Sequence, residues 1–304
     1  MKKKREKEMY KGLSNDNSHS KFKIFGVSLW RILGYFIIYS LLGYIVEVLY
    51  GLITKGVIES RQSFLYGPFC GIYGLGAILM LLPFKKRINA NRLQIFIGSA
   101  IIGCIVEYFI SWFGETFMHI KWWDYTNYFL NINGRVCLYF GIFWGILGIW
   151  LIKRLNPHVD EIIDRLKNKI PSFRRKAVVS AVSLFLLIDC IASVVALDYY
   201  KIRVVVENNV EVANFEEYQE RYNKIYSNEK RKRFIEVCWG NETMIKTFPN
   251  IKLNDKNGNI VYLNSFYPNI QNYYYKVFEN EVHNLQKEGR SLNCKIAYSY
   301  KPFK

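Results

Sequence analysis

Five apolar runs of about membrane-spanning length fill the first two thirds of this sequence. A transmembrane helix needs roughly 20 mainly apolar residues. We place the runs at residues 30–53, 64–82, 94–113, 136–152 and 177–197, the fourth being the shortest. Their length favours helices, and the sequence therefore predicts an all-α polytopic membrane bundle of about five transmembrane helices.

The polar ends of the chain form separate segments. Residues 1–29 are strongly basic, residues 30–197 form the expected membrane domain, and residues 198–304 are rich in Asn, Tyr, Lys and Glu. In the last segment, residues 202–212 suggest a strand or hairpin, Asn214 begins a helix, and Asn257-Gly258 is a hairpin signal. A second helix is expected over about 269–288. We expect a small α+β C-terminal domain with no catalytic constellation.

The net charge of +17 follows the apolar runs. Lysines and arginines gather before the first run, between the second and third, and between the fourth and fifth, whereas the intervening loops carry few. The positive-inside rule then places the N-terminus in the cytoplasm and, after five spans, the C-terminal region outside. The chain is expected to be a multi-pass protein of the cell membrane whose cations meet lipid headgroups. No groove-reading motif accompanies the charge, so nucleic acid is not an expected partner.

An amphipathic helix is expected in the cytoplasmic loop at residues 157–170. Pro157 suits a first helical position, and apolar residues then recur at helical spacing: Val159, Ile162, Ile163, Leu166 and Ile170. Two interpretations remain open. The helix lies on the inner leaflet, or it docks a cytoplasmic partner.

A duplicated motif gives the bundle its internal order. Gly43-Tyr-Ile-Val-Glu47 recurs as Gly103-Cys-Ile-Val-Glu107, and an arginine follows each copy, Arg61 and then Arg135. Glycines behind the arginines repeat with the same offset: Gly67, Gly71 and Gly74, then Gly141, Gly145 and Gly148. Both copies run from inside to outside, so the sequence predicts a parallel two-helix repeat whose axis lies along the membrane normal.

The repeated carboxylates are the candidate intramembrane polar site. A carboxylate in an apolar span is costly and is read as functional by default. Glu47 and Glu107 lie on stripes of small and polar residues that include Ser111, roughly 9 Å from the outer helix ends. Arg61 and Arg135 can reach inward from that boundary, and Asp189 is a third carboxylate in a span.

Three interpretations of this site remain open. The pairs of Glu and Arg clip the bundle together, they line an outward-facing polar cavity, or they belong to an intramembrane enzyme. We expect no metal site and no cofactor.

At these residues the sequence becomes similar to a known family. The blocks YSLLGYIVEVLY, FLYGPFCGIYGLGA and WWDY…NGR resemble the bacterial ABC-transporter permease family called type IV, or CmpB-like, over about residues 30–197. The resemblance implies a permease component of an ATP-driven transporter, but supplies no substrate and no catalytic residue.

A phosphate-binding GxxxxGK[ST] loop is missing from the sequence. The chain is thus not expected to be an enzyme, and an ABC function needs a separate ATPase, for which the 157–170 helix is the docking candidate. Five spans are few for a permease, so a homo-oligomer is expected. The alternative is a membrane scaffold or sensor that does not transport.

Overall fold

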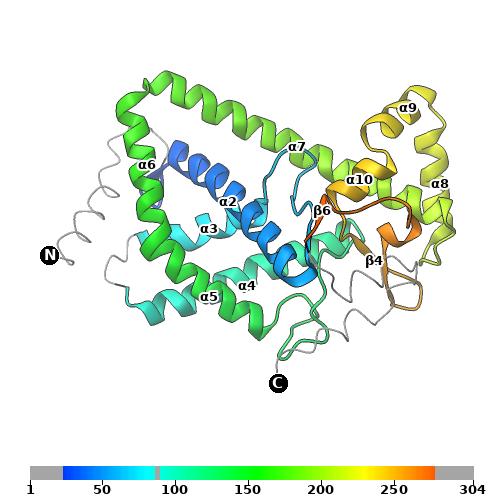
Figure 1. Ribbon diagram of the computed structural model, residues 1–304, viewed down its shortest axis with the longest axis horizontal. Helices are drawn as coiled ribbons and strands as arrows, with labels where there is room; N and C mark the ends of the chain where they lie inside the picture. Colours follow the sequence, from blue (N-terminus) through cyan, green and yellow to red (C-terminus); the bar gives the residue numbers. More distant parts are fainter. Residues whose placement is uncertain (1–22, 86–89, 278–304) are drawn as a thin grey trace. The chain divides into compact units, whose positions relative to one another are not determined.

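The computed structural model describes residues 23–85 and 90–277. It is mainly helical (Figure 1). The helices of the membrane region are α2 (Leu29–Lys55), α3 (Gly71–Lys85), α4 (Arg92–Phe117), α5 (Leu138–Trp150), α6 (Asn156–Lys169) and α7 (Ser172–Glu207). Three further helices follow, α8 (Phe215–Tyr226), α9 (Glu229–Cys238) and α10 (Asn241–Thr247).

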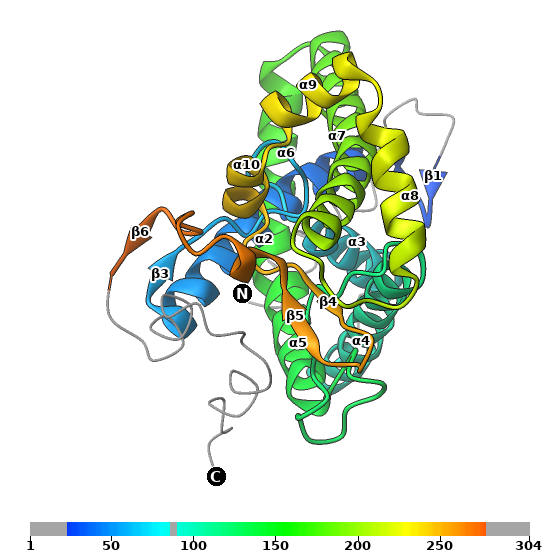
Figure 2. The same cartoon turned by 90° about the vertical axis from the view of Figure 1, so that its right-hand side faces the viewer.

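The strands are short and pair in twos. β1 (Lys23–Ile24) pairs with β2 (Val27–Ser28), β3 (Val57–Ile58) with β6 (Tyr275–Lys276), and β4 (Lys252–Asn254) with β5 (Ile260–Tyr262), each antiparallel. In the last pair Leu253 faces Val261 across a turn whose Gly258 has φ +81° (Figure 2). A positive φ favours glycine, which confirms the hairpin predicted from Asn257-Gly258.

The described residues divide into two compact units. Of the described residues, unit 1 comprises those within 23–43, 70–85, 90–109 and 128–187, and unit 2 those within 44–69, 110–127 and 188–277. Unit 2 thus combines the first loop predicted outside and part of the second with residues of the C-terminal region. Unit 1 contains α6 together with the beginnings of α2 and α7.

Four helical segments are long and apolar enough to cross a membrane: Leu29–Lys55, Arg92–Phe117, Leu138–Lys169 and Ser172–Glu207. The apolar stretch Gly71–Phe84 is shorter. The all-helical membrane architecture is confirmed, although the second span differs from the others. Its 15 residues give about 22 Å of helix, compared with a hydrocarbon core of about 30 Å.

The second span begins seven residues later than expected. Residues 59–70 are irregular, and Pro68 lies before the helix rather than in its first turn. Gly67 has φ +83° and does not belong to the helix, so Gly67xxxGly71 is not a helical packing face. Proline disfavours helix at the residue before it, which is consistent with a helix that starts only at Gly71.

The fourth span continues into the loop helix without a break (Figure 1). Between α5 and α6 lies a π-helical turn, Leu151–Leu155, in which the Asn156 N–H donates to the carbonyl of Leu151. Pro157 has no N–H, and its ring would collide with the carbonyl four residues earlier in a regular helix. The wider turn accommodates this proline, so the interruption expected between residues 152 and 157 does not occur.

Close approaches of small residues join the helices of each repeat in unit 1. The space for a Cβ on Gly74 is occupied by the Oγ of Ser40, 2.2 Å away, and that on Gly148 by the Oγ of Ser99, 2.1 Å away. Gly43 and Gly103 are covered in the same way by Tyr73 and Trp144 respectively, and the two rings lie 5.6 Å apart between centroids. These glycines therefore allow the two helices of each repeat to approach closely.

The C-terminal region is partly as expected. Helix α8 begins after Asn214, as predicted, but Asn214 has φ 62° and makes no side-chain cap hydrogen bond. The strand or hairpin predicted at 202–212 is wrong, because α7 continues to Glu207. Residues 269–277 are not helical, and the rest of the helix expected over 269–288 lies outside the described residues.

Candidate functional site

A charged network in unit 2 contains the first repeated carboxylate. The Nη1 of Arg61 donates to Glu47 at 3.0 Å, and its Nε donates to Glu59 at 3.1 Å. Glu59 also accepts from Lys55 at 2.9 Å and from the side-chain amide of Asn250 at 3.1 Å. Arg61 therefore pairs with the carboxylate of its own repeat.

Glu59 is the centre of this network. Burial opposes its ionisation, but Lys55 and Arg61 hold the pKa of its carboxyl below the ordinary value. A buried carboxylate with two cationic partners and an amide donor stays charged. Glu59 is therefore an anion that holds its sequence neighbours Lys55 and Arg61 together with the distant Asn250 around one point.

A second set of charges belongs to the same unit. Lys121 donates to Asp124 at 2.9 Å, and its backbone exchanges hydrogen bonds of 2.9 and 3.3 Å with that of Lys252. The Lys252 ammonium lies 5.3 Å from the centre of the Tyr262 ring. This set brings the loop after α4 and the β4–β5 hairpin together.

The second repeated carboxylate has different surroundings. Glu107, in unit 1, is buried and accepts a hydrogen bond of 3.0 Å from the indole Nε1 of Trp144 on α5. Arg135 donates to the hydroxyl of Tyr108 at 3.2 Å, and its guanidinium lies 5.3 Å from the centre of that ring. The two repeats thus share a sequence motif but hold their carboxylates with different partners.

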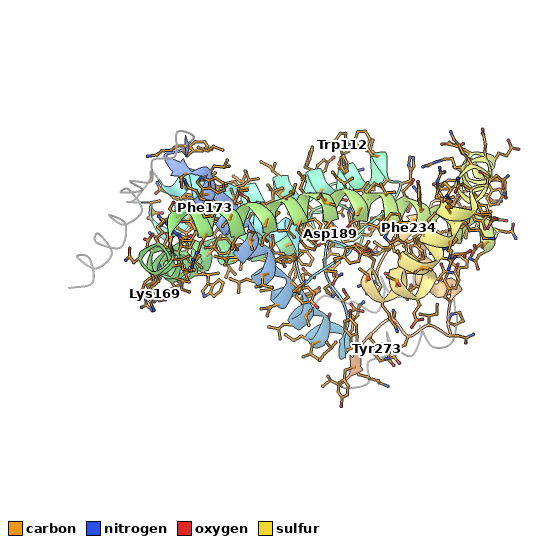
Figure 3. All side chains as sticks on the ribbon, turned by 90° about the horizontal axis from the view of Figure 1, so that it is seen from above. Trp112, Lys169, Phe173, Asp189, Phe234 and Tyr273 are labelled. Carbon is orange, nitrogen blue, oxygen red and sulfur yellow. The ribbon has the colours of Figure 1, made fainter. Side chains whose placement is uncertain are left out.

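The remaining predicted site residues make local contacts. Asp189 lies part-way along α7 (Figure 3) and accepts hydrogen bonds of 3.1 and 3.2 Å from the backbone N–H of Tyr66. Ser193, one turn later, accepts from the N–H of Leu65 at 2.6 Å. Ser111 is buried and reaches the Glu115 carboxylate at 3.5 Å. Asp189 and Ser193 therefore satisfy the irregular backbone before α3, which is a structural role.

A third polar network, in unit 1, holds α6 against the beginning of α2. The buried Arg31 is paired with Asp160 at 3.2 Å and with Asp164. Tyr35 donates to Asp160, and Tyr39 donates to the Asn156 side chain at 2.9 Å. Three side chains spaced four residues apart on α2 thus contact α6, and we call this set the α6 latch.

The five apolar residues predicted on this helix face two ways. Val159 is buried and Ile163 packs beside it in the core of unit 1. Ile162, Leu166 and Ile170 are 53%, 44% and 37% exposed, and they follow one another at i, i+4 spacing. The exposed stripe is therefore limited to these three.

The cationic partners of Glu59 and the whole α6 latch were not predicted from the sequence. Some signal was present, because Arg31 is a charge in the first apolar run and Lys55 and Glu59 have i, i+4 spacing. Lys252 gave no such signal, since its neighbours Lys121 and Tyr262 are recognised only from the fold.

Known proteins identify the membrane region. A protein-family model described as "Putative ABC-transporter type IV" matches residues 34–194, more than half of the 304 residues. The chain belongs to this family. The match to the type IV ABC-transporter family runs from α2 into α7 and includes both copies of the repeated motif. The C-terminal helices α8 to α10 lie outside it. No curated protein and no solved structure matches the chain.

Membership of the type IV family agrees with the long apolar helices. Together they assign a membrane protein of a transporter family.

Proposed function

We propose that this chain is the membrane subunit of an ATP-driven transporter, which moves a small solute or ion with the help of a separate ATPase. The observation that carries the proposal is the α6 latch. It joins an exposed apolar stripe on α6 to the buried start of α2, and α6 is also continuous with α5. A force applied by a partner at the stripe would act directly on two candidate spans.

The docking surface is the stripe of Ile162, Leu166 and Ile170. Its neighbours Glu161 and Arg165 form an exposed ion pair of 2.6 Å. Because Glu161 and Arg165 satisfy each other, the surface offered to a protein partner is the apolar stripe itself, which suits docking of an amphipathic helix into a groove.

The same proposal fixes the orientation of the chain in the membrane. The stripe must face the cytoplasm, where ATP is available, which agrees with the cationic loops and a cytoplasmic N-terminus. The C-terminal part of unit 2 then lies outside. Support comes from its pairing with both predicted outer loops, β6 with β3 and Lys252 with Lys121.

The transport pathway would use the repeated carboxylates. Glu47 and Glu107 are placed by equivalent motifs on α2 and α4, and each has a polar partner, Arg61 and Trp144 respectively. We propose that two or more copies of the chain assemble around the pathway, because so few spans enclose little space in one copy.

Co-purification tests the proposal. The full chain, isolated in mild detergent from its natural host, should retain an ABC ATPase, and Ile162→Asp with Leu166→Asp should abolish the association by placing charge in the apolar contact. The matched control is Glu161→Ala with Arg165→Ala, which changes the same helix beside the stripe and should retain the ATPase. If no ATPase accompanies the wild-type chain, the transport proposal fails.

The second candidate is a membrane scaffold or sensor. The observation that favours it is that the two carboxylates Glu47 and Glu59 are neutralised by the two cations Arg61 and Lys55, since such ion pairs can simply clip a loop to a helix. Glu47→Gln and Glu107→Gln separate the two candidates. Folded protein with lost ATP-driven uptake supports the pathway, whereas loss of folded protein in both variants supports the clip.

A further inference from the structure

One cluster of charges in unit 2 has one more cation than it has carboxylates. Four cations come together there, Lys55, Arg61, Lys121 and Lys252, with three carboxylates, Glu47, Glu59 and Asp124. Each of the first three cations lies within 3.1 Å of a carboxylate oxygen. In the part of the chain that the structure describes, no ion pair includes Lys252.

Lys252 is held firmly in this position. It belongs to β4, where it pairs with Tyr262 of β5, and its backbone is bonded to that of Lys121. The side chain is half-buried over the Tyr262 ring. The fixed backbone and the contact between the ammonium and the aromatic ring restrict the conformations of the Lys252 side chain.

The electrostatic surroundings disfavour the charged form. Burial lowers the pKa of Lys252 to about 8; Asp124 works against this shift, and Lys55, Lys121 and Arg61 add to it. Desolvation and nearby like charge both penalise an ammonium. An added anion would reduce both penalties, because it would supply the counterion that the protein itself does not place there.

We propose that Lys252, with Lys121 and Lys55 beside it, forms a binding site for one oxyanion group, a phosphate or a carboxylate. The group would accept hydrogen bonds from the Lys252 ammonium and balance the excess of one positive charge. Glu59 and Asp124 hold the other cations in place, so the site is arranged before the anion arrives.

The oxyanion can belong to a soluble solute or to a lipid headgroup. We assign it to a solute, and in this respect the inference rests on the proposed function, because it makes the transported substrate anionic. The binding site itself does not depend on transport. Loss of ATPase co-purification would refute the proposed function alone, whereas the binding assay below would refute this site alone.

Binding is measured by isothermal titration calorimetry on the full chain in neutral detergent, with inorganic phosphate and sodium acetate as separate probes. At pH 7 we expect saturable binding of at least one probe, weakened about tenfold or more by Lys252→Met, because a charge-assisted hydrogen bond is lost. Binding should also weaken as the pH rises above about 8, where the Lys252 ammonium deprotonates.

The neighbouring Lys256 provides the matched control. It follows β4 in the same hairpin, is exposed and pairs with Glu211 at 2.8 Å, so Lys256→Met should leave the affinity unchanged. Lys252→Arg keeps the charge and should restore binding, which separates loss of the site from misfolding.

Lipid discs distinguish the two sources. If discs of phosphatidylglycerol block the probe and discs of phosphatidylcholine do not, a headgroup occupies the site; if neither blocks it, the ligand is a soluble anion. The site is refuted if neither probe binds, or if Lys252→Met binds as tightly as Lys256→Met.

Discussion

Replacing Gly148 by alanine tests how closely α4 and α5 approach. The new methyl carbon would lie 2.1 Å from the Oγ and 2.2 Å from the Cβ of Ser99, so the helices must separate. Overpacking of this kind costs about 1–3 kcal/mol, while alanine gains up to about 1 kcal/mol over glycine within a helix. We expect a net loss of up to about 2 kcal/mol, and recovery of most of it when Ser99→Gly is added.

The same test on the other repeat should give a different answer. A methyl group on Gly74 would lie 2.2 Å from the Oγ of Ser40 but also 2.8 Å from the backbone carbonyl oxygen of Phe36. A backbone atom cannot be removed by mutation, so Ser40→Gly should fail to rescue Gly74→Ala. We therefore expect Ser99→Gly to rescue Gly148→Ala, and Ser40→Gly not to rescue Gly74→Ala.

Stability is followed as the fraction of purified protein that remains monodisperse on size-exclusion chromatography after heating in detergent. Gly76→Ala is the control, because nothing lies within 4 Å of its Cβ position, and it should be neutral or slightly stabilising. If Gly148→Ala proves as stable as Gly76→Ala, the close approach of α4 and α5 is wrong.

Two more predictions concern buried carboxylates. Glu59→Gln leaves Lys55 and Arg61 without their shared anion and should destabilise the chain by about 3 kcal/mol at pH 7 in denaturant titration. Because the folded pKa of Glu59 is lowered, its contribution is full above about pH 4.3 and is lost as the pH falls through the folded value; a variant with the same acid sensitivity as wild type would contradict this. Trp144→Phe removes the donor to Glu107 and should cost about 1.5–3 kcal/mol. Trp150→Phe, on the exposed side of α5, should cost far less in the same thermal assay, and equal losses would argue against the Trp144 contact.

The helical spans were predictable because hydrophobic length is a local property. Residues 30–53 and 94–113 fall within α2 and α4. The boundaries of the helices were harder to predict. The run Leu65–Cys70 is apolar, but it is not helical, because Pro68 and the positive φ of Gly67 interrupt it and α7 supplies its hydrogen-bond acceptors.

The contacts between side chains that the fold brings together could not be predicted from the sequence. The motif predicted that Arg61 has a nearby carboxylate, but not that Glu59 shares it, since the second contact depends on how the loop folds back. The strand or hairpin expected over 202–212 is wrong because β-branched residues within a long helix are tolerated when buried, and Val204 and Val205 are fully buried. Tertiary contacts outweighed local preference at these positions.

The irregular segment before α3, residues 59–70, has a consequence for the order in which the chain folds during synthesis. The N–H groups of Leu65 and Tyr66 find their acceptors on Ser193 and Asp189, more than 120 residues later in the chain. Before α7 has been synthesised, the N–H groups of Leu65 and Tyr66 lack the acceptors that they have in the folded chain. Leaving backbone N–H groups without hydrogen bonds in lipid is costly. We infer that the second span is finished late, when α7 arrives, so truncation before residue 189 should leave this hairpin exposed to proteases even though both of its helices have been made.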